Sequence, residues 1–436
     1  MRVAMPINWN LYASSLTNIA KNNFREIGKL MNETKSFTIS AIGIQALNVG
    51  DFNHHYDLLH IPNMGGYKFA LDASANCKNI ILGASGIDEV IYGKEVEVWK
   101  GRWRYVKKDI AKEISYWKKY ADKIKSIYVP ANSELEEFHK YFDIPRKKIS
   151  VIHHGVNRDF FIPSIDKKST RKKILSKLKI PDSPYFLHIG ESNYERKNQK
   201  RLGQAFKQAK NSQPEFKHNL IIAGKHYPSI EKKLSKIDGI FFLDWISDED
   251  LLELIQGADA FVLPSIHEGF GMPLVESMSC GIPCISCNRH APPEIMSNSG
   301  LLVDPTNIED ISNSMIKLAQ DKKLLEDLST KSLVRSQDFS WEKNAKEIFK
   351  LYEINSSKPM EDFEKQYQYA AFRTLVTVSD FFPTPNIDLL GPLLRFNYLD
   401  LMTWGVDIGL KNSKTKDFLL PFADWYKLKI EEISKE

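Results

Sequence analysis

Cysteines, long apolar runs and a strong net charge are scarce or missing in this sequence, and each absence excludes a class of protein. Four cysteines in 436 residues do not form a disulfide framework, so we expect a reducing, cytoplasmic setting. The sequence contains no run of about 18 apolar residues, so we expect no membrane span. MRVAMPINWN at the amino terminus lacks the apolar core of a signal peptide. A net charge of +5 without a nucleic-acid-binding motif gives no reason to expect nucleic acid as a partner.

Short apolar runs alternate with amphipathic helical patterns across residues 183–320. This alternation is typical of parallel βαβ units in a doubly wound, Rossmann-like sheet, which binds ligands at the carboxyl ends of its strands. The expected strands are YFLHIG (185–190), NLIIAG (219–224), GIFFLDW (239–245), AFVLPS (260–265), PCISC (283–287) and LLVD (301–304), and helices are expected near 197–210, 229–237, 248–258, 273–280 and 308–320.

A second, less regular α/β pattern fills the first 160 residues. Two such domains that face each other enclose a cleft, where small-molecule sites tend to lie. We therefore expect one domain at 1–162, a second at 163–355, and an appended segment at 356–436, where prolines and aromatics interrupt the pattern. Strands of the first domain are expected in FTISAIGI (37–44), YDLLHIP (56–62), KNIILGAS (78–85), SIYVPA (126–131) and KISVIHH (148–154), with helices near 14–32, 105–120 and 132–141.

The stretch HEGFGMPLVE (267–276) follows one of these strands and forms a loop that enters a helix. Glu268 stays on the loop, whereas Glu276 lies about one turn into the helix, where an acid can accept hydrogen bonds from sugar hydroxyls. Gly269 and Gly271 allow the backbone to approach a ligand closely, and the helix N-terminus favours a phosphate. The pattern predicts a site for a nucleoside diphosphate that carries a polyhydroxylated group.

With these residues the sequence resembles the retaining glycosyltransferases of family 4, which have the GT-B fold of two facing Rossmann-like domains. The resemblance covers residues 120–350 well and the first 120 loosely. The motifs that carry it, in order, are VIHHGVNRDFF (151–161), HIGESNYERKNQKRLGQAF (188–206), FLDWISDEDLLELIQGADAFVLPS (242–265), PSIHEGFGMPLVESMSCGIPCIS (264–286) and PPEIMSNSGLLVDP (292–305).

The resemblance implies roles for individual residues. Glu276 would bind the nucleotide ribose, and Glu268 would contact the transferred hexose. Arg196 and Lys197 would neutralise the diphosphate as it leaves. The same resemblance places backbone contacts to the donor at Gly190, Gly269, Phe270 and Gly271.

The implied reaction is the transfer of a hexose, with mannose as the first candidate, to a hydroxyl of a glycan or lipid-linked acceptor, with retention of configuration. The donor would be a GDP-hexose or, second, a UDP-hexose, and we expect no cofactor. We also expect no metal, because the basic pair takes its place. The Asp-x-Asp pair of Asp248 and Asp250 fits a helix start better, since acids in a first turn favour the helix dipole.

Two features depart from the family. Many relatives have a histidine after a core strand of the first domain, where this chain has Ser85, a hydroxyl that cannot carry a proton as imidazole does. His60 is a second candidate for the first-domain cleft, and a buried structural histidine explains it equally well. PINWNLYASS (6–15) stands where relatives have a glycine-rich loop.

Residues 94–125 contain eleven Lys or Arg and three Trp. Basic residues interleaved with aromatics suit peripheral contact with the anionic inner face of a membrane, although a solvated helix that packs its tryptophans inward explains them nearly as well. Cys280, Cys284 and Cys287 lie close enough for a metal site, but the run PCISC favours a buried strand in which cysteine acts as a small apolar residue.

Two other classes of function stay open at this point. A phosphorylase or nucleotide-sugar epimerase can be built on the same two-domain plan. A non-catalytic protein that binds a nucleotide sugar is the other, because the histidine and the usual amino-terminal loop are missing.

Overall fold

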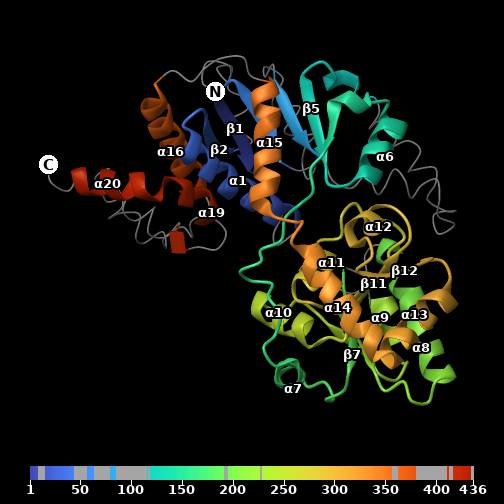
Figure 1. The fold of residues 1–436 in the computed structure, drawn as a ribbon. Helices are drawn as coiled ribbons and strands as arrows, with labels where there is room; N and C mark the ends of the chain where they lie inside the picture. Colours follow the sequence, from blue (N-terminus) through green and yellow to red (C-terminus); the bar gives the residue numbers. More distant parts are fainter. Residues whose placement is uncertain are drawn as a thin grey trace.

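The computed structural model describes residues 1–7, 15–43, 56–62, 79–84, 115, 118–190, 195–225, 228–355, 362–379, 410–411 and 416–433. Within these residues it contains two six-stranded sheets, and the strands of each sheet pair in parallel. Figure 1 shows the two sheets in separate halves of the molecule, each flanked by helices. The predicted α/β architecture of two doubly wound domains is therefore confirmed.

The first sheet has the strand order β2-β1-β3-β4-β5-β6. Its strands β3 and β4 are buried along their whole length, as parallel strands with helices on both faces must be. The strands are β1 (Arg2–Ile7), β2 (Thr38–Gly43), β3 (Leu58–Ile61), β4 (Ile80–Gly83), β5 (Ile124–Val129) and β6 (Ile149–Val151), with α1 (Ser15–Thr34), α6 (Asn132–Phe142) and the short 3₁₀ helix η3 (Arg146–Lys148) between them.

The second sheet has the order β12-β11-β10-β7-β8-β9. The chain adds β8 and β9 on one side of β7 and the later strands on the other, so the direction of winding reverses between β7 and β10. The strands are β7 (Tyr185–Ile189), β8 (Asn219–Ala223), β9 (Ile240–Leu243), β10 (Ala260–Leu263), β11 (Cys284–Cys287) and β12 (Gly300–Val303).

Several helices of the second domain begin at a capping side chain. Ser247 accepts a hydrogen bond from the amide of Asp250, and Asn307 accepts from the amides of Glu309 and Asp310. Asp248 and Asp250 thus occupy the first turn of a helix, as predicted. The helices are α7 (Lys167–Lys177), η4 (Glu195–Lys197), α8 (Gln199–Ser212), α9 (Pro228–Leu234), α10 (Asp248–Gly257), α11 (Met272–Ser279), α12 (Ala291–Met296), α13 (Ile308–Gln320) and α14 (Lys322–Ser336).

Helix α15 (Trp341–Asn355) returns to the first domain, although the sequence analysis assigns it to the second. Its buried residues Ala345, Ile348 and Tyr352 share one hydrophobic core with strands β1 and β2 and helix α1. Figure 1 shows α15 lying against the first sheet. The apolar face of this helix packs on the first domain. The boundary between the domains therefore lies before residue 341, not at 355.

The described part of the carboxyl-terminal segment also packs on the first domain. The hydroxyl of Thr374 accepts a hydrogen bond from the amide of Ala41 in β2 at 3.0 Å. Pro421 lies so close to Gly28 of α1 that a Cβ at Gly28 would come within 2.4 Å of the proline ring. The elements are α16 (Phe363–Ser379), α19 (Lys416–Leu419), η5 (Leu420–Phe422) and α20 (Ala423–Ile433).

Three cysteines lie in the interior of the second domain. Cys280, Cys284 and Cys287 are buried and not in disulfides, and the last two belong to strand β11. This placement agrees with the interpretation of PCISC as a buried strand. Among the described residues, no helix combines the length and apolar character that crossing a bilayer requires. The basic, aromatic stretch 94–125 falls outside them except for residues 115 and 118–125.

Candidate active site

The residues predicted to bind a diphosphate and a hexose meet where the second sheet reverses its winding. Arg196 and Lys197 follow β7 in η4, and Glu268 follows β10, the neighbouring strand. The backbone ties the two loops together, because the amide of Ile266 donates to the carbonyl of Arg196 at 2.8 Å. Ligands of doubly wound sheets bind at this kind of switch point, outside the carboxyl ends of the strands.

Glu268 forms a buried ion pair with the basic residues. Its Oε1 accepts from Nζ of Lys197 at 2.6 Å and from Oγ of Ser265 at 2.8 Å. Its Oε2 lies 3.7 Å from the guanidinium of Arg196. Burial alone would raise the pKa of Glu268, but the charges of Lys197 and Arg196 and the two hydrogen bonds outweigh it and lower the pKa. Glu268 is therefore a carboxylate at neutral pH.

Glu276 has the opposite electrostatic environment. It lies in α11 and is half-buried. Burial, and then repulsion from Asp248, raise its pKa to about 7. Near neutral pH the carboxyl of Glu276 is thus divided between its neutral and charged forms, and a hydrogen-bonding or cationic ligand would shift that balance.

The backbone between the two glutamates is shaped by its glycines. Gly271 caps α11 with φ of 85°, a conformation that residues with a Cβ rarely adopt. Phe270 is buried, and its ring packs against His154 and Phe339 with centroids 5.0 Å and 5.7 Å away. The phenyl ring therefore anchors the loop. Gly190, at the end of β7, leaves room for Lys197, whose Cδ would lie 3.2 Å from a Cβ there.

His60 is a structural residue in this fold. It is completely buried in β3, and its Nε2 and Nδ1 lie 2.8 Å and 2.6 Å from the hydroxyls of Tyr128 and Tyr352. Burial lowers its pKa to about 3, so the ring is neutral. This position favours the structural alternative over a role in the cleft. Ser85, the other first-domain candidate, lies outside the described residues.

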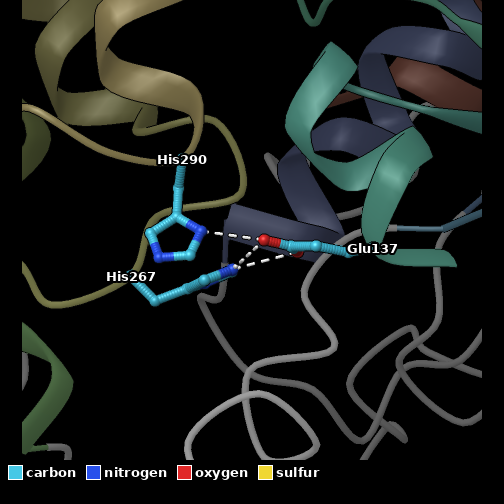
Figure 2. A group of neighbouring side chains, drawn as sticks. All are labelled: Glu137, His267 and His290. Atoms are coloured by element: carbon cyan, nitrogen blue, oxygen red, sulfur yellow. Dashed lines mark hydrogen bonds and ion pairs between the residues drawn. The ribbon is translucent and has the colours of Figure 1, made fainter. Parts of the chain in front are cut away.

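Sequence reasoning missed a group of residues that connects the two domains beside this site. Glu137 of α6 contacts His267, the residue before Glu268, and His290, the residue before α12 (Figure 2). A second contact joins Glu294 of α12 to Asn132 and His153 of the first domain. Glu137 stands 130 residues from His267 and 153 from His290, so no local pattern reveals the group.

The fold belongs to a class that is known from solved structures. Solved structures of the GT-B type superpose on the chain, among them Anabaena HepE in complex with UDP and glucose, with a TM-score of 0.63 over 81% of this chain and 100% of that one, at 13% identity. WaaG, a glycosyltransferase involved in lipopolysaccharide biosynthesis, superposes with a TM-score of 0.57 over 80% of this chain and 99% of that one, also at 13% identity. At this identity the likeness concerns the fold, which is GT-B.

The sequence of the second domain is similar to a known family. Residues 170–334, which make up most of that domain, match the family model of glycosyl transferases group 1. O-antigen chain mannosyltransferase B of Escherichia coli is 28% identical over 262 residues, which are 58% of this chain and 65% of that protein. Serotype-specific mannosyltransferase WbdA of Escherichia coli is 26% identical over 229 residues, which are 50% of this chain but only 28% of that protein. The chain thus spans less than two thirds of either relative.

Proposed function

We propose that this protein is a retaining glycosyltransferase that moves a hexose from a nucleoside-diphosphate sugar to an acceptor hydroxyl. The observation that supports it most is the buried group of Lys197, Arg196 and Glu268 at the switch point of the second sheet. This group places two cations and one carboxylate where a diphosphate and the hexose attached to it would lie. The family model that matches residues 170–334 supports the same assignment.

The charges of the site suit the departure of an anion. Lys197 and Arg196 pair with Glu268, and a bound diphosphate would share them. They would stabilise the negative charge that develops as the bond between the anomeric carbon and the phosphate oxygen breaks. The acceptor oxygen would attack the same face of the sugar, and its proton would pass to the leaving phosphate. Glu276 would hold the ribose, and the amides of Gly269 to Gly271 would face the hexose.

Mannose is the sugar we favour. Two relatives with mannosyltransferase names are described above, and a third, the MMP alpha-(1->4)-mannosyltransferase of Mycolicibacterium hassiacum, is 23% identical over 339 residues, which are 74% of this chain and 75% of that protein. GDP-mannose is therefore the first donor to test. A UDP-hexose is the second, because the HepE structure contains UDP and glucose.

The first experiment is a thermal-shift assay of the purified protein with GDP, UDP, ADP and TDP in excess chelator. A nucleotide at a hundred times its Kd adds about 2.7 kcal/mol to the free energy of unfolding, which is a readily measured shift. We expect one nucleotide to be selective and its shift to disappear in Glu276→Ala. Glu231→Ala, on the exposed surface of α9, is the matched control and keeps the shift. A protein that responds to none of the four would contradict the proposed donor site.

Turnover is measured with the selected nucleotide sugar and a glycan or lipid-linked acceptor, again in chelator. We expect full activity, because Arg196 and Lys197 supply the positive charge that a metal provides elsewhere. Activity that disappears in chelator and returns with a divalent cation would overturn this part of the proposal. Tight nucleotide binding without any transfer would instead identify a non-catalytic binding protein.

Peripheral membrane contact is part of the proposal for a lipid-linked acceptor. It rests on the eleven basic residues and three tryptophans of residues 94–125. We expect co-sedimentation with vesicles that contain anionic lipid and release at high salt, since screening weakens such contacts. A protein that stays in the supernatant at low salt would contradict the membrane contact without affecting the donor site.

A further inference from the structure

Glu137, His267 and His290 bring three metal-ligating side chains together at the junction of the two domains (Figure 2). Oε1 of Glu137 lies 2.8 Å from Nδ1 of His290, and Oε2 lies 3.1 Å from Nε2 of His267. All three ligand atoms lie within 4.8 Å of one another. Figure 2 shows the carboxylate reaching from the first domain toward both rings.

The surroundings hold these side chains in place. His267 is only 1% exposed, and the Glu137 and His290 side chains are 12% and 14% exposed. The two imidazole rings lie with their centroids 4.1 Å apart and their planes tilted by 58°. His290 also has φ of 60° and ψ of −139°, a strained conformation for a residue with a side chain. Strained backbone conformations are frequent at ligand-binding sites, where the surrounding structure maintains them.

We propose that these three residues bind a divalent transition-metal ion, with zinc as the best fit. Zinc sites with two histidines and one glutamate are well known, and a water molecule completes their tetrahedron. Bonds of about 2.0–2.2 Å set neighbouring ligand atoms about 3.3 Å apart. The distances from Glu137 to the two ring nitrogens are already close to that spacing. Nε2 of His267 and Nδ1 of His290 would each offer a lone pair, with the ring proton on the other nitrogen.

The ion would act as a bond between the domains. Glu137 belongs to α6 of the first domain, whereas His267 and His290 belong to loops of the second. His267 directly precedes Glu268, so the ion would tie this loop to the first domain, while Lys197 and Ser265 hold the Glu268 carboxylate in place with or without the ion. The ion lies outside the group transfer itself, which the proposed function assigns to residues of the basic pair and the two glutamates.

The test uses the full chain, stripped with chelator, and zinc chloride alone as the probe. We expect isothermal titration to show one saturable site and thermal unfolding to shift upward with zinc. His290→Ala and Glu137→Gln should each weaken zinc binding by at least tenfold. His153→Ala is the matched control, because it breaks the other contact between the domains, the 2.7 Å pair of His153 with Glu294, and leaves the three ligands intact.

Cobalt gives a readout that does not depend on stability. Tetrahedral coordination by two ring nitrogens, one carboxylate oxygen and a water molecule should produce visible absorption in wild type and His153→Ala. That absorption should be lost in His290→Ala. Equal zinc affinity in wild type and His290→Ala would overturn the proposal. So would the absence of a saturable site in the wild type. In either case the group is a hydrogen-bonded contact between the domains. Nucleotide binding is scored separately, so failure here is distinguishable from failure of the proposed function.

Discussion

Glu268 and Glu276 occupy the same short stretch, yet the fold shifts their pKa values in opposite directions. Lys197, Arg196 and Ser265 surround Glu268 and keep it charged. Burial and the negative charge of Asp248 raise the pKa of Glu276 and favour its neutral form. Two identical side chains thus differ in their protonation. Glu268 is already paired with cations, whereas a hydrogen-bonding or cationic partner would stabilise the charged form of Glu276.

We expect Glu276→Gln to change stability and binding in opposite directions. The pKa of Glu276 rises from 4.5 to about 7 on folding, so the folded state binds the proton more tightly. The resulting stabilisation is present below pH 4.5 and is lost as pH rises through 7. Because glutamine does not ionise, Glu276→Gln does not lose stability as pH rises. Its urea midpoint should be higher than that of wild type at pH 8, with little difference near pH 4.5.

Nucleotide affinity should increase with pH, whereas the stability contribution of Glu276 decreases. The reason is that the charged carboxylate is the better acceptor for ribose hydroxyls. Wild-type affinity should strengthen as pH rises from 6 to 8, and Glu276→Gln should bind weakly and with a flat pH dependence. Calorimetric titration at pH 6, 7 and 8 measures it. Parallel pH profiles for the two proteins would show that Glu276 does not contact the nucleotide.

Lys197→Met should damage both stability and transfer. It leaves Glu268 buried beside Arg196 alone, at 3.7 Å, and breaking a buried pair costs about 3 kcal/mol. Transfer should fall by at least about a hundredfold, as when an electrostatic contact to the transition state is lost. The double variant Lys197→Met with Glu268→Gln should regain stability but not transfer, and Lys200→Met, on the exposed face of α8, should resemble wild type. Urea unfolding and a nucleotide-release assay separate the two effects.

Among the elements, strands and helices of the second domain could be predicted well because their signals are local. The helix predicted at 308–320 has those bounds, since Asn307 caps it and an apolar stripe faces the sheet. Apolar runs likewise located β10 and β11. The partner of a helix is not a local property. Nothing within residues 341–355 shows that their apolar face matches the first sheet and not the second.

The residues of the candidate site also differ in whether a local sequence signal reveals them. Glu268, Arg196 and Lys197 could be found because each follows a recognisable strand, and the order of strands then brings them together. Glu137 and its two histidines could not, because they meet only when both domains are placed. The sequence left two roles open for His60, because a histidine after apolar residues has the same local pattern whether it faces a cleft or two tyrosines.

The contact of α15 with the first sheet can be tested with Tyr352→Phe. The Tyr352 hydroxyl lies 2.6 Å from Nδ1 of buried His60, and its loss leaves that nitrogen without this partner. A buried group deprived of its hydrogen bond costs about 1–3 kcal/mol. Urea unfolding should show this loss, whereas Lys346→Gln, on the exposed face of α15, should stay within about 0.5 kcal/mol of wild type. Equal stability of the two variants would mean that the contact does not hold α15.

Across the whole molecule, the described carboxyl-terminal helices belong to the first domain and complete its core. Gly28→Val tests this, because a Cβ at this position would meet the Pro421 ring at 2.4 Å and 2.6 Å. Overpacking of this kind costs about 1–3 kcal/mol. We expect lower stability and faster proteolysis near the carboxyl terminus. Glu33→Val, on the exposed side of the same helix, should leave cleavage unchanged.

The return of α15, α16 and α20 to the first domain has a consequence for synthesis. Strands β1 to β6 and helix α1 leave the ribosome early, but the other helices that cover the apolar face around Val3, Phe37 and Ile39 follow only after residue 341. At about 5–20 residues per second, that apolar face waits some tens of seconds, while the second domain is made in one uninterrupted piece. The later domain should therefore be the first to become protease-resistant on the ribosome, and the earlier one should depend on chaperones until the chain is released.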